Sequence, residues 1–229
     1  MLAALATLIE METSMIIAAP DAGVGKSTLL AALLEAVPPK RELLFVPPDS
    51  VPPPSEASPH MTIISGEMSP HHPAYLWGDD LINVIVQVHH GAQLLTTAHA
   101  NDGLGVAHIL AGGSGSPSTE VLAHWPIVVV LRPDRQAKFS DHPLSRIDAI
   151  WRLGVDAGEQ IQTDLFTGDS DRGVVMEQIM RAIPAFKIER CIAWEHHIMT
   201  ARAAPRHRDR PGVMLDLAER KRSAHSDGS

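Results

Sequence analysis

The sequence predicts an α/β fold, with a mostly parallel β-sheet that carries helices on both faces. Short apolar runs alternate with segments of helical spacing along much of the chain, a pattern typical of strands joined by crossover helices. Residues 127–131 (IVVVL) form an uninterrupted apolar run rich in β-branched residues, which suits a strand buried on both faces. After Pro133 the pattern changes and favours an antiparallel edge to the sheet.

Five strands of the parallel part are expected, each a short apolar run bounded by turn residues. They are residues 15–19, 43–46, 62–65, 92–97 and 127–131. Helices are expected between them, because apolar residues recur there at intervals of three and four. They are residues 27–37, 79–90 and 104–111. A proline-rich segment from Pro47 to Pro59 separates the second strand from the third and excludes regular structure there.

The C-terminal part of the chain predicts a hairpin, two helices and a tail. Residues 146–153 and 160–166 partly alternate and are separated by glycines, as in an antiparallel hairpin. The helices are expected at residues 174–183 and 188–201. We therefore divide the chain into a core at 1–169, a C-terminal helical segment at 170–201 and a polar tail, expected to be disordered, at 202–229.

Composition and charge exclude several classes of function. The chain has 229 residues and a formal net charge of −8, so no general positive field is present to hold a nucleic-acid backbone. Its one cysteine, Cys191, forms no internal disulfide and completes no zinc motif. The apolar stretch 1–9 lacks a basic start, and no apolar run reaches the roughly 18 residues of a bilayer span. Neither a signal peptide nor a membrane helix is expected.

The segment from Pro20 to Ser27 (PDAGVGKS) has the layout of a Walker A phosphate loop, with Pro20 where the first glycine belongs. Such a loop turns backbone N–H groups and a helix N-terminus toward phosphate oxygens, while its lysine bridges the terminal phosphates and its serine ligates Mg²⁺. We expect ATP and Mg²⁺ as ligands, Ser27 as the metal ligand, and the alternative of a ligand-free glycine turn stays open. The predicted nucleotide-binding residues are Ala22, Gly23, Val24, Gly25, Lys26, Ser27 and Thr28.

A second group of residues follows the third and fourth expected strands. Glu67 ends the segment TIISGE, where an acidic side chain can orient or deprotonate a water beside the terminal phosphate. Thr97 and His99 end the next strand and are candidates to sense that phosphate. A solvated loop glutamate and a structural histidine are the alternatives. The predicted catalytic residues are Lys26, Glu67 and His99.

Taken together, APDAGVGKST, IISGEM and GAQLLTTAHAND resemble, in order and spacing, the secretion ATPases of type II and type IV secretion and pilus machines. The stretches IVVVLRPD and RIDAIWRLGVDAGEQIQTDLFTGD resemble the tight-adherence (Flp) pilus branch. The resemblance covers about residues 2–169. It implies a RecA-like P-loop fold with Lys26 and Ser27 on phosphate and Mg²⁺, Glu67 as the catalytic glutamate and His99 as the histidine-box residue.

The same resemblance implies a working context. It predicts an Mg²⁺-dependent ATPase that forms a hexameric ring and powers pilus assembly or protein secretion. The ring is expected in the cytoplasm, on an inner-membrane platform protein. The lengths of the apolar runs and the acidic charge balance, rather than the resemblance, argue against a membrane span and a nucleic-acid partner.

The sequence departs from the pattern of the family in two places. The acidic pair expected after the second strand is reduced to Asp49, and about fourteen residues precede the first strand, where the family carries an N-terminal domain. This predicts a minimal ATPase core or a fragment. Arg41, Arg132 and Arg135 are candidates to act on a neighbouring subunit, although we interpret each first as an exposed structural residue.

Two other functions remain open. One is a nucleotide-binding or structural relative that has lost turnover. The other is a P-loop ATPase of another class, such as a partition or DNA-translocating ATPase, which the acidic balance disfavours but the basic tail from Arg202 to Arg222 keeps possible.

Overall fold

The computed structural model describes residues 1–47, 51, 53, 58–72, 75–111, 126–134, 145–156, 159–168, 172–183 and 187–203. The helices are α1 (Leu2–Glu10), α2 (Lys26–Leu33), the short 3-10 helix η1 (Leu34–Ala36), α3 (Gly78–His89), α4 (Gly103–Leu110), α6 (Arg172–Ala182) and α7 (Ile188–Ala203). The strands are β1 (Met15–Ala19), β2 (Glu42–Val46), β3 (Met61–Met68), β4 (Gln93–His99), β5 (Ile127–Pro133), β6 (Ser145–Asp156) and β7 (Glu159–Thr167).

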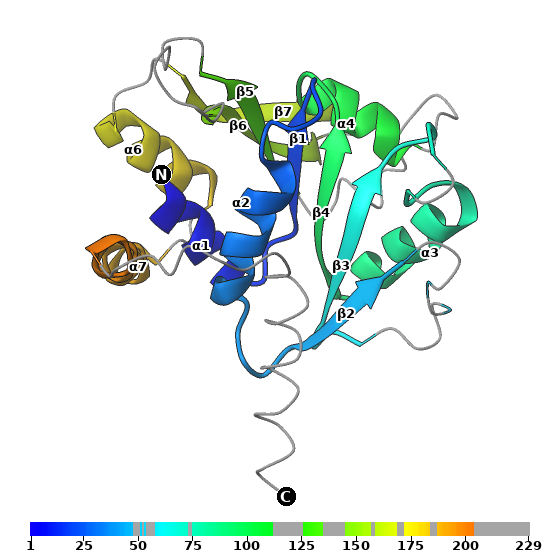
Figure 1. Ribbon diagram of the computed structural model, residues 1–229, viewed down its shortest axis with the longest axis horizontal. Coiled ribbons are helices and arrows are strands. Elements are labelled where there is room, and N and C mark those ends of the chain that lie inside the picture. The colour runs from blue at the N-terminus through cyan, green and yellow to red at the C-terminus, as the bar shows by residue number, and fades with distance from the viewer. Residues whose placement is uncertain are drawn as a thin grey trace, which may run out of the picture.

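These strands form one seven-stranded sheet in the described part of the chain, in the order β2-β3-β4-β1-β5-β6-β7. The pairs from β2 to β5 are parallel, whereas β6 and β7 add antiparallel strands at one edge. The predicted fold class is confirmed, with a parallel centre, helices on both faces and an antiparallel edge hairpin (Figure 1). β1 lies at the centre and all five of its residues are buried, which places the loop after it in the middle of the sheet edge.

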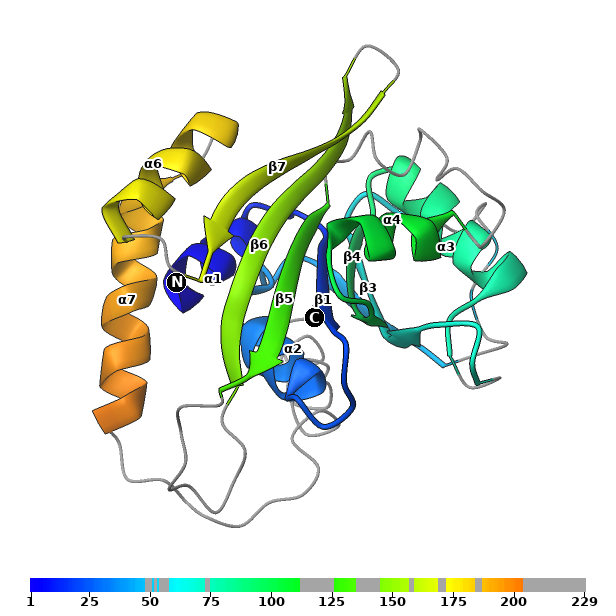
Figure 2. The same cartoon turned by 90° about the horizontal axis from the view of Figure 1, so that it is seen from above.

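Each face of the sheet buries its own core. One core joins α1, α2, α6 and α7 to Ile17, Leu95 and Val129 of the strands. The other joins α3 and α4 to Ile16 and Leu94. Side chains of a strand alternate between the two faces, so β1 and β4 contribute to both cores. Figure 2 shows the two groups of helices on opposite sides of the sheet.

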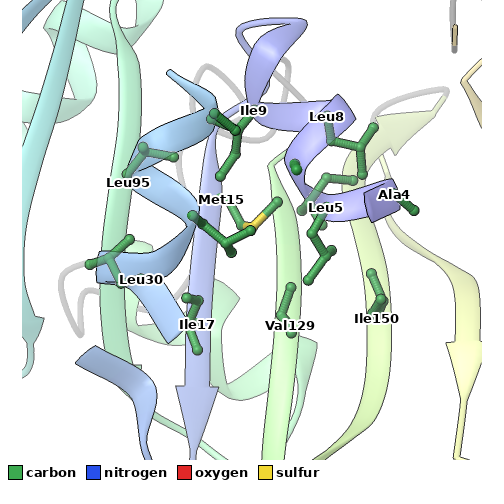
Figure 3. Packing of buried hydrophobic residues seen from close by; sticks show 14 of the residues in the cluster. Ala4, Leu5, Leu8, Ile9, Met15, Ile17, Leu30, Leu95, Val129 and Ile150 are labelled. Atoms are coloured by element: carbon green, nitrogen blue, oxygen red, sulfur yellow. The ribbon is translucent and has the colours of Figure 1, made fainter. Parts of the chain in front are cut away.

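Helix α1 was not predicted as a helix. Its residues are apolar on all sides, and those from Ala3 to Ile9 are buried, so no polar stripe reveals a helical period. Leu5 and Leu8 pack toward Met15, Val129 and Ile150 of the sheet (Figure 3). Helix α7 packs against α1. A helical segment that is apolar on all sides is expected to be buried on all sides, as α1 is.

The remaining expected elements are present with shifted ends. β3 and β4 extend to Met68 and His99, beyond the predicted ends at 65 and 97, so Glu67 and His99 lie within the strands. The predicted helix 27–37 ends as α2 at Leu33 and continues as η1. The proposed boundary at residue 169 stays a prediction, although Val175 and Cys191 join the core of α1. The predicted tail lies outside the described residues from 204 onward.

Among the described residues, no helix is both long and apolar enough to cross a membrane.

Candidate nucleotide site

Three strands reach the same edge of the sheet, and their carboxyl ends bring the predicted site residues together. β1 pairs with β4 so that Ala19 lies opposite His99. β3 pairs with β4 so that Glu67 lies opposite Thr97. The glycine-containing loop begins directly after Ala19. Because open α/β sheets bind ligands at the carboxyl ends of their parallel strands, this edge is the candidate site.

The loop between β1 and α2 presents bare backbone to open space. Gly23 and Gly25 have positive φ angles of 74° and 91°, a conformation that other residues rarely adopt. A Cβ atom added to either glycine meets nothing within 4 Å. Val24, between them, is buried with 5% of its surface exposed and anchors the loop to the core. The loop is therefore fixed at its centre and open on both sides of it.

Helix α2 begins directly after this loop with an N-terminus that its own side chains leave free. Gly25 is the N-cap and has no side chain, so the cap position supplies no hydrogen bond to the first-turn N–H groups. Ser27 and Thr28 are exposed in that turn, whereas Lys26 is buried. An uncapped helix N-terminus with a lysine and two hydroxyl groups fits a phosphate chain and the Mg²⁺ that accompanies it. The loop residue Ala22 is exposed as well.

The three predicted catalytic residues lie in a row. Lys26 Nζ is 3.4 Å from Glu67 Oε2 and 3.4 Å from the backbone oxygen of Asp21. His99 Nδ1 is 3.7 Å from the other carboxylate oxygen of Glu67. The exposed fraction of the side chains falls from 43% for His99 to 20% for Glu67 and 7% for Lys26. A carboxylate thus lies between a buried lysine and an exposed histidine, while Thr97 is buried beside them.

A cavity of about 730 Å³ adjoins the phosphate loop. Gly23, Gly25 and Thr28 line it on the loop side. The opposite wall is mostly apolar and comes from α1 and the strands β5 to β7; its residues are Met1, Leu2, Leu131, Ser145, Ile147 and Phe166. An apolar hollow of this size next to a phosphate loop fits the base and ribose of a nucleotide.

The expectation of exposed arginines was wrong for Arg41, which is only 4% exposed. It donates to Thr62 Oγ1 at 2.8 Å, to Glu12 Oε2 at 2.8 Å and to the Pro59 oxygen at 2.9 Å, and also to the Met61 oxygen. Five guanidinium N–H donors need several acceptors when buried, and the start of β3 and two connecting segments supply them here. This arginine is therefore committed within its own chain.

Arg132 is exposed, as expected, and pairs with Asp148 at 2.7 Å. Arg135 and Asp49 lie outside the described residues.

Two polar residues near Glu67 were missed in the sequence. Ser65 and Thr96 are buried, and their hydroxyl oxygens lie 2.7 Å apart. The available signal was a hydroxyl residue inside each of two apolar strands, since buried polar side chains need specific partners.

No family model matches the chain, and no curated protein sequence matches it. Two solved ATPase structures are similar to it. One is the VirB11 ATPase of the Brucella suis type IV secretion system in complex with sulphate, with a TM-score of 0.44 and 17% identity, covering 65% of this chain and 50% of that one. The other is the Legionella pneumophila ATPase DotB, with a TM-score of 0.40 and 13% identity, covering 91% of this chain and 61% of that one. The chain thus spans half of the length of the first of these proteins and less than two thirds of the length of the second.

Proposed function

We propose that this chain binds ATP with Mg²⁺ and hydrolyses it. The observation that carries the proposal is the meeting of Lys26, at the start of α2, with Glu67 and His99, at the ends of β3 and β4. A lysine at a phosphate loop and a glutamate at the carboxyl end of another strand of the same sheet supply two charges that phosphoryl transfer to water uses.

Binding uses the loop and the cavity together. The N–H groups of the loop and of the first turn of α2 hold the phosphates, Lys26 neutralises their charge, and Ser27 ligates the metal. The apolar wall that includes Ile147 and Phe166 receives the base. Mg²⁺, when bound, neutralises charge that develops on the phosphate oxygens.

Hydrolysis uses Glu67 to orient and deprotonate the attacking water. Lys26 Nζ is 3.4 Å from this carboxylate, and a phosphate bound at the loop competes for the same lysine. Phosphate binding therefore frees Glu67 to accept a hydrogen bond from water. His99 lies against the opposite carboxylate oxygen and limits the directions in which Glu67 turns.

We further propose that the ATPase acts as a ring-forming motor in pilus assembly or protein secretion. The resemblance of the phosphate loop, the Gly-Glu segment and the histidine segment to secretion ATPases supports this role. A hexamer on the cytoplasmic side of an inner-membrane platform protein is the arrangement that the resemblance implies.

The test measures Mg²⁺-ATP binding and phosphate release by the purified chain over a range of protein concentrations. Lys26→Ala is expected to weaken ATP binding by about a hundredfold or more, since it removes the central cation of the phosphate loop. Lys40→Ala is the matched control, because Lys40 is 67% exposed and pairs with Glu12. Turnover that rises with concentration supports the ring.

Other outcomes separate the alternatives. Tight ATP binding without phosphate release at any concentration favours the relative that has lost turnover. Equal ATP binding by the wild type and Lys26→Ala contradicts the nucleotide site. DNA binding that depends on salt and on the tail after residue 203 favours the DNA-translocating class.

A further inference from the structure

Strand β3 contains one extra residue where it runs beside β4. Ile64 lies opposite Leu95, and Glu67 lies opposite Thr97. Two residues of β3, Ser65 and Gly66, therefore face one residue of β4. This is the geometry of a β-bulge, which bends a strand and changes the direction of the side chains that follow it.

The bulge decides which face of the sheet Glu67 occupies. Ile64 belongs to the core of α2, and Met68 belongs to the opposite core of α3 and α4. With strict alternation, residues 64 and 68 share one face. The extra residue reverses the alternation, so that Met68 enters the α3 side and Glu67 enters the α2 side. Without the bulge, Glu67 faces away from Lys26.

A chain of two buried hydroxyl groups holds the bulge. Thr96 Oγ1 lies 2.7 Å from the Gly66 carbonyl oxygen and donates to it. Ser65 Oγ lies 2.7 Å from Thr96 Oγ1 and 3.3 Å from the same Gly66 carbonyl oxygen, to which it is also placed to donate. Thr96 is fully buried and Ser65 is 4% exposed. Gly66 is exposed, so its backbone gains little support from packing.

We infer that Thr96 is a positioning residue for Glu67. Its hydroxyl pins the Gly66 carbonyl from the neighbouring strand, which keeps the bulge in place and the Glu67 carboxylate on the Lys26 side. Thr96 lies opposite Ile16, whose side chain belongs to the core of α3 and α4. It therefore acts on Glu67 through the backbone of β3, from the face of the sheet opposite to Lys26. The effect on turnover rests on the proposed function, whereas the effect on the direction of Glu67 does not.

The test compares three variants of the full chain. Thr96→Val removes the hydroxyl and keeps the shape, and Thr96→Ser restores the hydroxyl. Thr7→Val is the matched control, because Thr7 in α1 is also fully buried and donates to a backbone oxygen, that of Ala3, at 2.8 Å. For each variant, kcat and KM for Mg²⁺-ATP and the urea midpoint are measured.

We expect Thr96→Val to lower kcat about tenfold at nearly unchanged KM, the effect of one lost neutral hydrogen bond on the barrier. Thr96→Ser is expected to recover most of that rate. Thr7→Val is expected to lower the urea midpoint and leave kcat unchanged. Equal kcat in the wild type, Thr96→Val and Thr7→Val overturns the inference, as does a Thr96→Ser variant that is as slow as Thr96→Val.

A crystal structure of Thr96→Val gives a second reading that is independent of turnover. If the wild type proves inactive, the proposed hydrolysis fails, but the position of Glu67 in this crystal structure still tests the inference. Displacement of the Glu67 carboxylate from Lys26 supports it. A Glu67 that remains opposite Thr97 and in contact with Lys26 overturns it. If Thr96→Val does not fold, the same structure is determined for Thr96→Ala, which also removes the hydroxyl group, and the same two readings apply.

Discussion

The two ends of β3 each bring a buried cation to a glutamate, but they hold the cation differently. Near its amino end, Arg41 donates to Thr62 and to Glu12, each at 2.8 Å. Near its carboxyl end, Lys26 lies 3.4 Å from Glu67. Both cations are almost fully buried, with 4% and 6% exposed. The difference therefore lies in the contacts rather than in burial.

The contrast separates a structural cation from a functional one. A guanidinium with short hydrogen bonds to a hydroxyl, a carboxylate and backbone oxygens already has its donors satisfied, so a new acceptor offers it little further stabilisation. An ammonium with long contacts to one carboxylate and one carbonyl gains by meeting a stronger acceptor, such as a phosphate. Burial lowers the pKa of Arg41, and Glu12 offsets part of that shift. We infer that Arg41 at the amino edge of the sheet keeps its contacts, whereas Lys26 at the carboxyl edge exchanges Glu67 for a stronger acceptor.

The largest expected effect is at the carboxyl edge. Glu67→Gln removes the base but keeps the size of the side chain, so phosphate release is expected to fall at least about a hundredfold. ATP binding is expected to change little, because the loop and Lys26 remain. The measurement is phosphate release at saturating Mg²⁺-ATP, with the exposed Glu42→Gln on β2 as the matched control. A Glu67→Gln variant with the wild-type rate removes Glu67 from the mechanism.

At the amino edge we expect a change in stability instead. Arg41→Leu leaves the acceptors at Thr62, Pro59 and Met61 without their donor, which is expected to cost about 3 kcal/mol of unfolding free energy. Lys40→Ala removes a cation from the same Glu12, but at an exposed pair that contributes less than about 1 kcal/mol. Urea unfolding measures both. Equal losses in the two variants contradict the structural role of Arg41.

The comparison also explains what the sequence predicted well. The apolar runs of β1 and β5 define strands buried on both faces, and the spacing of Gly23, Gly25 and Lys26 defines a loop whose geometry is local. Strands that end at one edge of a parallel sheet bring Glu67 and His99 to that loop. These features follow from short segments of sequence and a simple rule of topology.

The features that were missed depend on partners far along the chain. Arg41 is buried because Glu12 and Thr62, from other segments, supply its acceptors. The bulge at Ser65 and Gly66 reflects the register between β3 and β4, and hydrophobic alternation alone does not specify register where a strand is buried on both faces. The residues of α1 show no helical period in their hydrophobicity, because nearly all of them are apolar.

A smaller effect is expected in the cavity beside the loop. If the apolar wall holds the base, ATP binds more tightly than inorganic triphosphate in the presence of Mg²⁺. Phe166→Ala is expected to narrow that difference about fivefold, since an aromatic contact contributes about 1 kcal/mol. Affinity for triphosphate is expected to stay unchanged, which separates the loss of a base contact from a general loss of folding. Calorimetric titration measures both ligands, and an equal loss for both contradicts the base site.

The smallest expected effect concerns an exposed ion pair near the amino edge, where Arg190 and Trp194 of α7 donate to Glu10 of α1. Burial by itself raises the pKa of Glu10, but these hydrogen bonds outweigh it, so its pKa lies below the ordinary value of 4.5. A carboxyl with a depressed pKa in the folded state stabilises the fold above its unfolded pKa, and this contribution is lost as pH falls through the folded pKa. The urea midpoint of the wild type is therefore expected to exceed that of Glu10→Gln slightly at pH 7 and to converge with it below pH 4.5. A difference between the two midpoints that persists unchanged at pH 3 shows that Glu10 acts by packing rather than by charge.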